Sequence, residues 1–339
     1  MQIKPYGQVV KEAAAELKQY QNKEKLLINT RFPWLEGLKP GDIVLLGGPS
    51  FTGKTYLLND IKDDVMNIDL NPAADKFIWL SNSLEMTNLN NLINDIAKYI
   101  HKSKKEILTT HFDDMEKGMV NRLVSLKSDG RYYVNEDTFT PAEFETKIRA
   151  FIEAHSDAEC IFIDTDHLRF TKGSNKKAVI DELMEIQNVL KKAYPNVVFI
   201  DISQFNRDII GRADDKSEKA KIQRSDFADS DVAFTVSDFV IGINMPVISG
   251  IEQYRLVSPK FHDYLTDHFA DFNTKGTKVS FKTHARIFYE VLKSRFVDGF
   301  NAKNLFIALI GEDVAEEAPA AKTKPKFKDV DTITLPFKN

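Results

Sequence analysis

The sequence predicts an α/β fold: a mainly parallel, twisted sheet flanked by helices, with antiparallel strands at its C-terminal edge. Short apolar runs alternate with longer amphipathic stretches through most of the chain. The runs are near-continuous and rich in β-branched and aromatic residues, which is typical of parallel strands buried on both faces. After Pro246, strand-like segments follow one another without helices between them. This change favours antiparallel hairpins at the end of the domain.

Composition bounds the function classes. The chain has 339 residues, of which 42% are hydrophobic, so a sizeable core is expected. Its single cysteine, Cys160, excludes an internal disulfide and a cysteine-based zinc site. The sequence has neither a long apolar span nor a secretory signal, so we expect a cytoplasmic protein (host cytoplasm if viral) without a membrane partner. The net charge of −4 still allows a local basic groove for nucleic acid.

Each element is predicted from its own pattern. The predicted strands are 43–46, 77–80, 160–163, 197–202 and 239–243, and the predicted helices are 54–66, 86–102, 141–155 and 178–193. Later strand-like segments are 251–258, 277–283, 286–293 and 306–309. Residues 312–339 are highly charged and lack periodicity, so we expect a disordered tail. The main domain is then expected to span 27–311.

An N-terminal helix and linker are predicted for residues 1–26. Apolar residues recur at helical spacing within 6–24, namely Val9, Val10, Ala13, Ala14 and Leu17. A lone helix of this length is marginal in water, so its apolar face needs a surface to pack on. A neighbouring subunit and the chain's own core are the two surfaces that we consider.

A phosphate-binding loop is the strongest local motif. The segment Gly48-Pro49-Ser50-Phe51-Thr52-Gly53-Lys54-Thr55 fits G-x4-G-K-[ST] without a mismatch. A predicted strand precedes it and a predicted helix follows it, as this motif requires. Its backbone N–H groups and the helix N-terminus favour phosphate oxygens. We expect Lys54 to reach the β- and γ-phosphates of ATP and the Thr55 hydroxyl to bind Mg²⁺.

Further polar residues follow three of the predicted strands. Asp164 ends the strand 160–163, where ligands bind in open α/β sheets, and is expected to hold the metal, with Asp166 as the runner-up. Glu85 follows the strand 77–80 and is the candidate general base. Gln204 follows the strand 197–202 and could hydrogen-bond the γ-phosphate or the attacking water. An ATP site at this sheet edge is therefore predicted.

Together these motifs resemble the RecA-like ATPase core of DnaB-type replicative helicases, over about residues 27–310. The resemblance rests on the lead-in 34–42 with its phosphate loop, Ser83-Leu84-Glu85-Met86, the Asp164 strand, Ser203-Gln204-Phe205-Asn206-Arg207, and Lys293-Ser294-Arg295. It implies a P-loop NTPase that forms a homo-hexameric ring, with ATP sites between subunits and single-stranded DNA in the channel. Lys293 and Arg295 would then complete a neighbour's site. A primase or a helicase loader is an implied partner.

The sequence departs from the family's pattern at several places. Only about 26 residues precede the core, as in short phage-type members. The Asp164 segment reads Asp-Thr-Asp-His-Leu where the family usually has aspartate, an aromatic residue, Leu, Gln and Leu. The loop 226–231 has Ala228 and Asp231 where the family has the arginine and glycine of its DNA-gripping loop. The alternative DNA-binding residues are the cations that follow two sheet strands: Lys172, Lys176, Lys177, Arg207, Arg212 and Arg224.

The sequence therefore predicts an ATP- and Mg²⁺-dependent, ring-forming DNA helicase of the replicative type. Two alternatives stay open. The first is a RecA-like DNA-binding motor or recombinase-like ATPase that does not unwind DNA. The second is a structural or regulatory ring that uses nucleotide for assembly alone.

Overall fold

The computed structural model describes most of the chain up to residue 245 and several strands beyond it. The described residues are 4–85, 87–166, 168, 172–173, 175–205, 222, 224–227, 231–245, 253–257, 273–275, 278–282, 286–294 and 305–309. The predicted tail, 312–339, lies outside the described residues.

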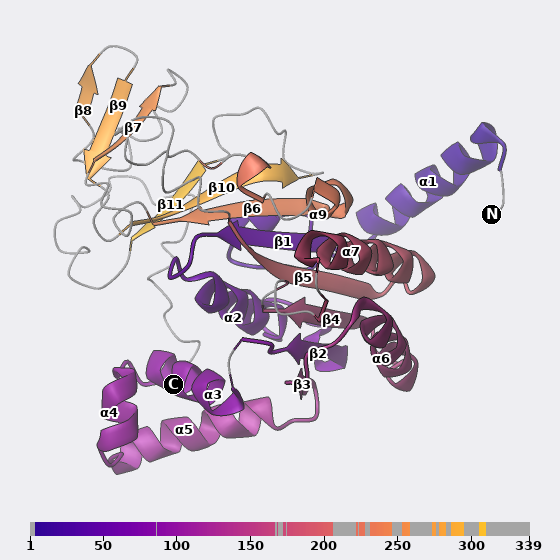
Figure 1. Ribbon diagram of the computed structural model, residues 1–339. Helices are drawn as coiled ribbons and strands as arrows, with labels where there is room; N and C mark the ends of the chain where they lie inside the picture. The colour runs from indigo at the N-terminus through magenta and orange to yellow at the C-terminus, as the bar shows by residue number, and fades with distance from the viewer. Residues whose placement is uncertain are drawn as a thin grey trace.

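The main sheet has eight strands in the order β11-β10-β6-β1-β5-β4-β2-β3 (Figure 1). Its parallel strands are β1 (Ile43–Gly48), β2 (Phe77–Asn82), β3 (Tyr132–Asn135), β4 (Cys160–Thr165), β5 (Val197–Gln204) and β6 (Phe239–Asn244). Two antiparallel strands complete the β6 edge: β10 (Arg286–Ser294) and β11 (Leu305–Leu309). A second antiparallel sheet contains β7 (Gln253–Val257), β9 (Lys278–Lys282) and β8 (Asn273–Lys275). The predicted fold class is confirmed, although β3 and β8 were not expected from the sequence.

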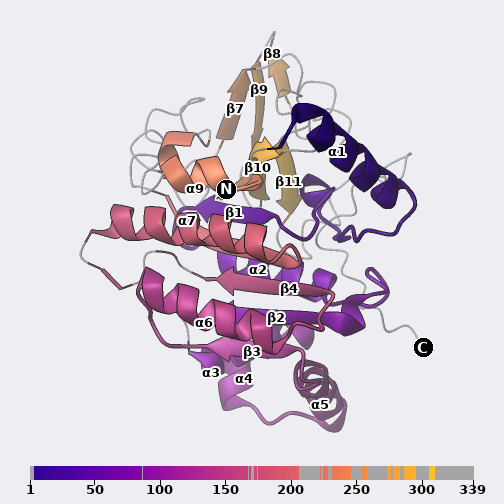
Figure 2. The same cartoon turned by 90° about the vertical axis from the view of Figure 1, so that its right-hand side faces the viewer.

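Helices cover both faces of the main sheet (Figure 2). One face packs on α2 (Lys54–Val65) through Leu57, Leu58, Ile61 and Val65. The other face packs on α6 (Pro141–Ala154) and α7 (Lys176–Ala193), with the short α9 (Asp231–Val236) beside them. Strand β1 is buried along its whole length and sends alternate side chains to the two cores. Burial on both faces explains why these strands read as continuous apolar runs.

The predicted N-terminal helix is α1 (Tyr6–Gln21), and it projects away from the body (Figure 1). None of its residues is buried against the described part of the chain. Tyr6 is 82% exposed and Leu17 is 57% exposed. Packing of this helix on its own core, one of the two alternatives, is therefore not what the structure shows. Docking on a neighbouring subunit remains a prediction.

A three-helix insert between β2 and β3 was only partly predicted. It consists of α3 (Asn88–Tyr99), α4 (Lys104–Thr109) and α5 (Asp114–Lys127), and only α3 was expected. Both missed helices begin with a capping box, Ser103 with Glu106 and Asp113 with Glu116, so this spacing was the available signal. The insert has a small core of its own around Ile96, Ile100 and Leu123.

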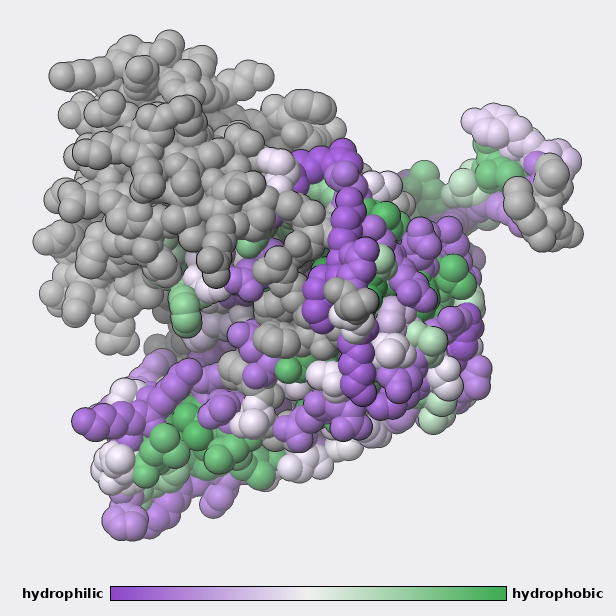
Figure 3. Space-filling model, in the orientation of Figure 1, coloured by the Kyte–Doolittle hydropathy of each residue, from purple (hydrophilic) through white to green (hydrophobic). Residues whose placement is uncertain are grey.

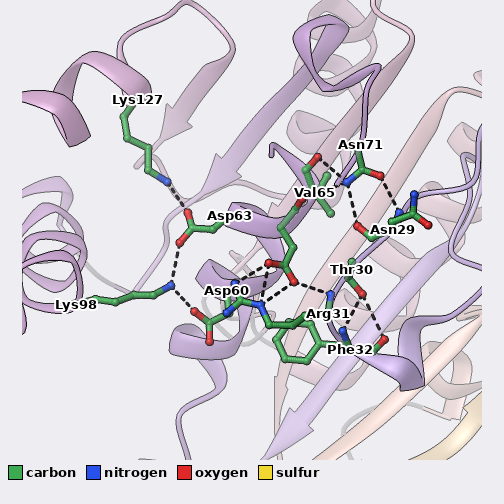
Figure 4. A network of polar contacts seen from close by, with 11 residues as sticks. Asn29, Thr30, Arg31, Phe32, Asp60, Asp63, Val65, Asn71, Lys98 and Lys127 are labelled. Atoms are coloured by element: carbon green, nitrogen blue, oxygen red, sulfur yellow. Dashed lines mark hydrogen bonds and ion pairs between the residues drawn. The ribbon is translucent and has the colours of Figure 1, made fainter. Parts of the chain in front are cut away.

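Ion pairs fasten this insert to α2 (Figure 4). Lys98 of α3 binds Asp60 and, at 2.9 Å, Asp63, both from α2. Lys127 of α5 binds Asp63 at 2.9 Å as well. Burial opposes the charge on Lys98, but the two carboxylates outweigh it and raise the pKa of this ammonium group. The helix that follows the phosphate loop is thus joined by charge to α3 and α5.

The other side of α2 is tied to the segment that leads into β1 (Figure 4). The backbone N–H and the guanidinium of Arg31 both donate to the Asp64 carboxylate, at 2.8 Å. Asn71 donates to the carbonyls of Asn29 and Asp64 at 2.9 and 3.1 Å. Together with the ion pairs to α3 and α5, these bonds hold both flanks of α2 in place.

Among the described residues, no helix has the length and apolar character needed to cross a membrane.

Lys98→Met is expected to lower the free energy of unfolding by about 3 kcal/mol, because it removes the ion-pair partner of the Asp60 carboxylate, which is 1% exposed. Urea unfolding of the nucleotide-free protein measures this loss. The matched control is Lys117→Met, which removes an exposed ion pair with Asp114 on the same insert. Its cost should stay below about 1 kcal/mol. Equal losses in the two variants would show that the buried pair has no special role.

Candidate functional site

The phosphate loop lies between β1 and α2, as predicted. Gly53 has a φ of +83°, and Phe51 also adopts a left-handed backbone with a φ of 65°. A Cβ atom on Gly48 would lie 2.5 Å from the carbonyl oxygen of Ile243 in β6, so a side chain has no room there. The loop therefore starts at a close contact between β1 and β6 and then curls over the start of α2.

Lys54 points into the loop that carries it. Its Nζ donates to the Pro49 carbonyl at 2.6 Å, and the Thr52 hydroxyl donates to the same carbonyl at 2.9 Å. Lys54 is 9% exposed. Burial lowers its pKa to about 8, and the negative charge of Glu85 partly offsets this effect. The charge of Glu85 therefore favours the protonated form of Lys54.

The strand register brings the predicted site residues to one edge of the sheet. Gly48 of β1 pairs with Gln204 of β5, and Asp164 of β4 pairs with Ser81 of β2. Gln204 donates a hydrogen bond to the Ser50 hydroxyl of the phosphate loop. The carboxyl ends of β1, β5, β4 and β2 therefore meet at one edge of the sheet, and this edge carries Lys54, Gln204, Asp164 and the Glu85 turn, as expected for an open α/β sheet.

Asp164 is buried on the face of the sheet that α2 covers. Its Oδ2 accepts hydrogen bonds from Trp79 Nε1 at 2.5 Å and Ser81 Oγ at 2.6 Å. Burial raises the pKa of this carboxyl, and the Lys62 ammonium acts against that shift. Sequence reasoning missed Trp79, Ser81 and Lys62. Lys62 follows Thr55 by two helical turns and so lies on the same side of α2, which was the available signal.

The residues present fit a magnesium ion. The Thr55 hydroxyl and the Asp164 carboxylate line the same cavity and are oxygen ligands of the kind that Mg²⁺ prefers. The described part of the chain has no cluster of three or more His, Cys, Asp or Glu residues suited to a metal. An ion here would take its other ligands from phosphate oxygens and water, which is usual for Mg²⁺.

Glu85 is exposed in the turn after β2, and Asp166 holds that turn. The Asp166 carboxylate accepts the backbone N–H of Leu84 at 2.7 Å and that of Glu85 at 3.3 Å. Burial raises the pKa of Asp166 to about 6. Asp166 was expected as the second choice for the metal, and its contacts with the turn were not foreseen.

Lys293 lies toward the amino ends of the parallel strands, whereas the phosphate loop lies at their carboxyl ends. In the antiparallel register it pairs with Val240, whereas Phe288 pairs with Asn244 near the phosphate loop. Its Nζ donates to the carbonyls of Thr235 and Phe234, at 2.6 and 3.0 Å, at the end of α9. A bulge between Val291 and Lys293 interrupts the regular pairing at the end of this strand. Arg295 lies outside the described residues.

The predicted DNA-binding cations are only partly described. Lys172, Lys176 and Lys177 are exposed, and they follow β4 at the same sheet edge as the phosphate loop. Arg224 pairs with Asp231 at 3.3 Å and lies over the Phe234 ring. Arg207 and Arg212 lie outside the described residues.

Comparisons with known proteins agree with this geometry. The chain resembles a structure described as the ATPase domain of G40P, with a TM-score of 0.61 and 12% sequence identity, over 87% of this chain and 93% of that one. It also resembles a DnaB-like replicative helicase described with its interactions with primase, with a TM-score of 0.60 and 12% identity, over 88% of this chain and 63% of that one. At such low identity these two likenesses show a shared RecA-like fold. Comparison with curated protein sequences found no match.

A family model decides the relationship. The model of the DnaB-like helicase C-terminal domain matches residues 32–246, which is more than half of the chain and includes the phosphate loop, Glu85, Asp164 and Gln204. The predicted resemblance is therefore confirmed, and the chain belongs to the family of DnaB-like helicase C-terminal domains.

Proposed function

We propose that the protein is a ring-forming replicative-type DNA helicase, which couples ATP hydrolysis to translocation on single-stranded DNA and to strand separation. Membership of the helicase family supports a helicase-type ATPase. The observation that carries the proposal is the convergence of Lys54, Glu85, Asp164 and Gln204 at one sheet edge. In the proposed reaction, water attacks the γ-phosphate of ATP.

In this proposal each residue has one task. Lys54 and the loop N–H groups bind the phosphates, and Glu85 accepts the proton of the attacking water. Gln204, which already contacts Ser50, senses the γ-phosphate. Thr55 and Asp164 hold Mg²⁺, which when bound neutralises phosphate charge.

Single-stranded DNA is the proposed polymer, and Lys172, Lys176 and Lys177 are its first proposed contacts. Their side chains are exposed beside the ATP edge, and sequence-independent binding needs little more than such cations and stacking groups. Arg207 and Arg212 complete the proposed set. A primase or a helicase loader is the proposed protein partner, and the cytoplasm, or that of the host, is the proposed location.

A second candidate function is a DNA-binding motor that hydrolyses ATP without unwinding. It is favoured by the ion pair between Arg224 and Asp231, which neutralises a cation just before the segment 226–231, where the family has its DNA-gripping loop. Grip on DNA is weaker when a phosphate-binding cation already has an anionic partner.

The test is the rate of ATP hydrolysis with and without single-stranded DNA, followed by unwinding of a forked duplex. The proposal expects DNA to stimulate hydrolysis and the fork to be separated. Glu85→Gln is the control, because it should bind ATP but hydrolyse it about 10²–10⁴-fold more slowly. Stimulated hydrolysis without strand separation would select the second candidate, and hydrolysis indifferent to DNA would contradict both.

Ring assembly is proposed to use α1, which docks on the neighbouring subunit. The apolar side chains of α1 are exposed, and apolar side chains also gather over α4 and α5 (Figure 3), where Leu108 is 65% and Met115 is 76% exposed. Exposed apolar faces of this kind mark protein contacts. Deleting residues 1–22 is expected to reduce the mass of the oligomer in light scattering. An unchanged mass would contradict the docking of α1.

ATP binding is expected to weaken about tenfold between pH 7 and pH 9. The pKa of Lys54 is about 8 without nucleotide, so the ammonium group loses its proton as the pH rises through this value. Bound phosphate stabilises the charged form, so affinity falls where the free protein must first take up a proton. Titration of a fluorescent ATP analogue at each pH measures the effect.

Two variants control for other titrating groups. Lys54→Arg keeps its charge throughout this pH range, so its affinity should not fall. Lys54→Ala should bind nucleotide weakly at every pH and lose turnover. The same pH dependence in Lys54→Arg would assign it to a group other than Lys54.

Lys293 and Arg295 are proposed to complete the ATP site of a neighbouring subunit. Lys293 lies toward the amino ends of β1 and β6, away from its own phosphate loop, and its Nζ donates to carbonyls at the end of α9. A cation supplied by a neighbour can be worth ~10³–10⁵ in rate. Arg295→Ala should therefore bind ATP, still form oligomers and lose turnover.

Mixing Arg295→Ala with Lys54→Ala should restore part of the activity, since some sites then combine an intact Lys54 with a neighbour's intact Arg295. ATP turnover is measured before and after mixing, with mixed oligomers verified by two affinity tags. If mixed rings form and stay inactive, Arg295 does not act in trans.

A further inference from the structure

The turn between β2 and α3 carries Glu85 and is held by a carboxylate from the neighbouring strand. Asp166 accepts the N–H of Leu84 through Oδ1 at 2.7 Å and the N–H of Glu85 through Oδ2 at 3.3 Å. We propose that Asp166 is a positioning residue: it fixes the backbone of this turn and thereby aims the Glu85 carboxylate at the phosphate loop. This inference rests on the proposed role of Glu85 in ATP hydrolysis.

The backbone of Asp166 is itself held in register with the turn. Its N–H donates to the Asn82 carbonyl at 3.2 Å, one step beyond the last paired residues of β2 and β4. The Asn82 side chain donates in return to the Asp164 carbonyl at 2.9 Å. Residues 164–166 are therefore fixed relative to Asn82, three residues before Glu85. A side chain anchored in this way can define where the turn goes.

The turn is also held from its other side. Ser83 donates its backbone N–H to the Asn135 carbonyl at 2.8 Å, and its hydroxyl accepts a hydrogen bond from Asn91 of α3 at 2.8 Å. The Ser83 hydroxyl lies 3.4 Å from Asp166 Oδ2. Asp166 and Asn91 thus hold the turn between β4 and the helical insert.

The surroundings of the two carboxylates separate their tasks. Asp166 is 6% exposed and turns both oxygens toward the N–H groups of the turn. Glu85 is exposed, and its charge acts on the Lys54 ammonium. An ionised acceptor makes stronger hydrogen bonds to backbone N–H groups than a neutral one does. A carboxylate at position 166 is therefore suited to hold the turn, while Glu85 remains available to water.

The test is a double-mutant cycle with Asp166→Asn, Glu85→Gln and the double variant. Asparagine has the same shape, but its NH₂ group must face one of the two backbone N–H groups. Single-turnover ATP hydrolysis should slow at least tenfold in Asp166→Asn, while the Kd for a non-hydrolysable ATP analogue stays within about twofold. Because Asp166 acts through Glu85, the double variant should be no slower than Glu85→Gln alone.

The matched control is Asp137→Asn, which removes an exposed carboxylate just after β3 at the same sheet edge. Its hydrolysis rate should equal that of the unaltered protein. Two further measurements complete the set: the dependence of hydrolysis on magnesium concentration, and thermal unfolding. Neither the magnesium concentration at half-maximal rate nor the unfolding temperature should change in Asp166→Asn.

Three results would overturn the proposal. Multiplied effects in the double variant would make Asp166 an independent catalytic group or metal ligand. A joint loss of ATP affinity and thermal stability would reduce its role to general structure. Unchanged hydrolysis in Glu85→Gln would remove the residue that Asp166 is proposed to aim. Since these readouts need no DNA unwinding, failure of the helicase activity alone would leave the decision on Asp166 intact.

Discussion

The fold of the site depends on how closely the end of β1 approaches its neighbours. A Cβ atom at Gly48 would lie 2.5 Å from the Ile243 carbonyl, and one at Gly47 would lie 2.1 Å from the Phe227 ring and 2.5 Å from the Phe205 ring. These glycines let β1 run between β5 and β6 up to the phosphate loop. The rings of Phe205 and Phe227 also pack edge to face, 4.7 Å apart. The residue after Gln204 and the segment that leads into α9 therefore contact each other at the strand end that carries the phosphate loop.

Burial of charge prepares this edge for a charged ligand. It lowers the pKa of Lys54 and raises the pKa of Asp164 and Asp166, because each group has lost part of its hydration. A nucleotide with its metal would bring opposite charge to groups whose desolvation has already occurred during folding. Fixed, partly dehydrated groups of this kind stabilise developing charge without reorganisation. The ion pairs of Asp60 and Asp63 also join α2, which begins at Lys54, to α3 and α5.

Local sequence patterns predicted the strands other than β3 and β8, the phosphate loop and the residues at the strand ends, because these follow from periodicity and from the geometry of parallel sheets. They could not predict that Asp166 binds the turn at Leu84, since the two residues are more than 80 positions apart and meet only through the register of β2 and β4. The position of Lys293 was obscured for a similar reason. Where Lys293 lies along the sheet depends on the antiparallel pairing of β10 with β6 and on a bulge. A K-x-R motif encodes neither of these.

The two edges of the sheet differ in a way that constrains assembly. The phosphate loop, Gln204 and the Glu85 turn lie at the carboxyl ends of the parallel strands, whereas Lys293 pairs near the amino end of β6. Helix α1 projects from the side of the body opposite to the carboxyl end of β1 (Figure 1). In the proposed ring, a contact that joins Lys293 of one copy to the phosphates of another uses two different surfaces of the same chain. Such a head-to-tail contact is heterologous, and it gives a closed ring only if the rotation between copies closes. An exposed helix that docks on the next copy would help to set that rotation, which gives α1 a geometric task beyond burying its own apolar face.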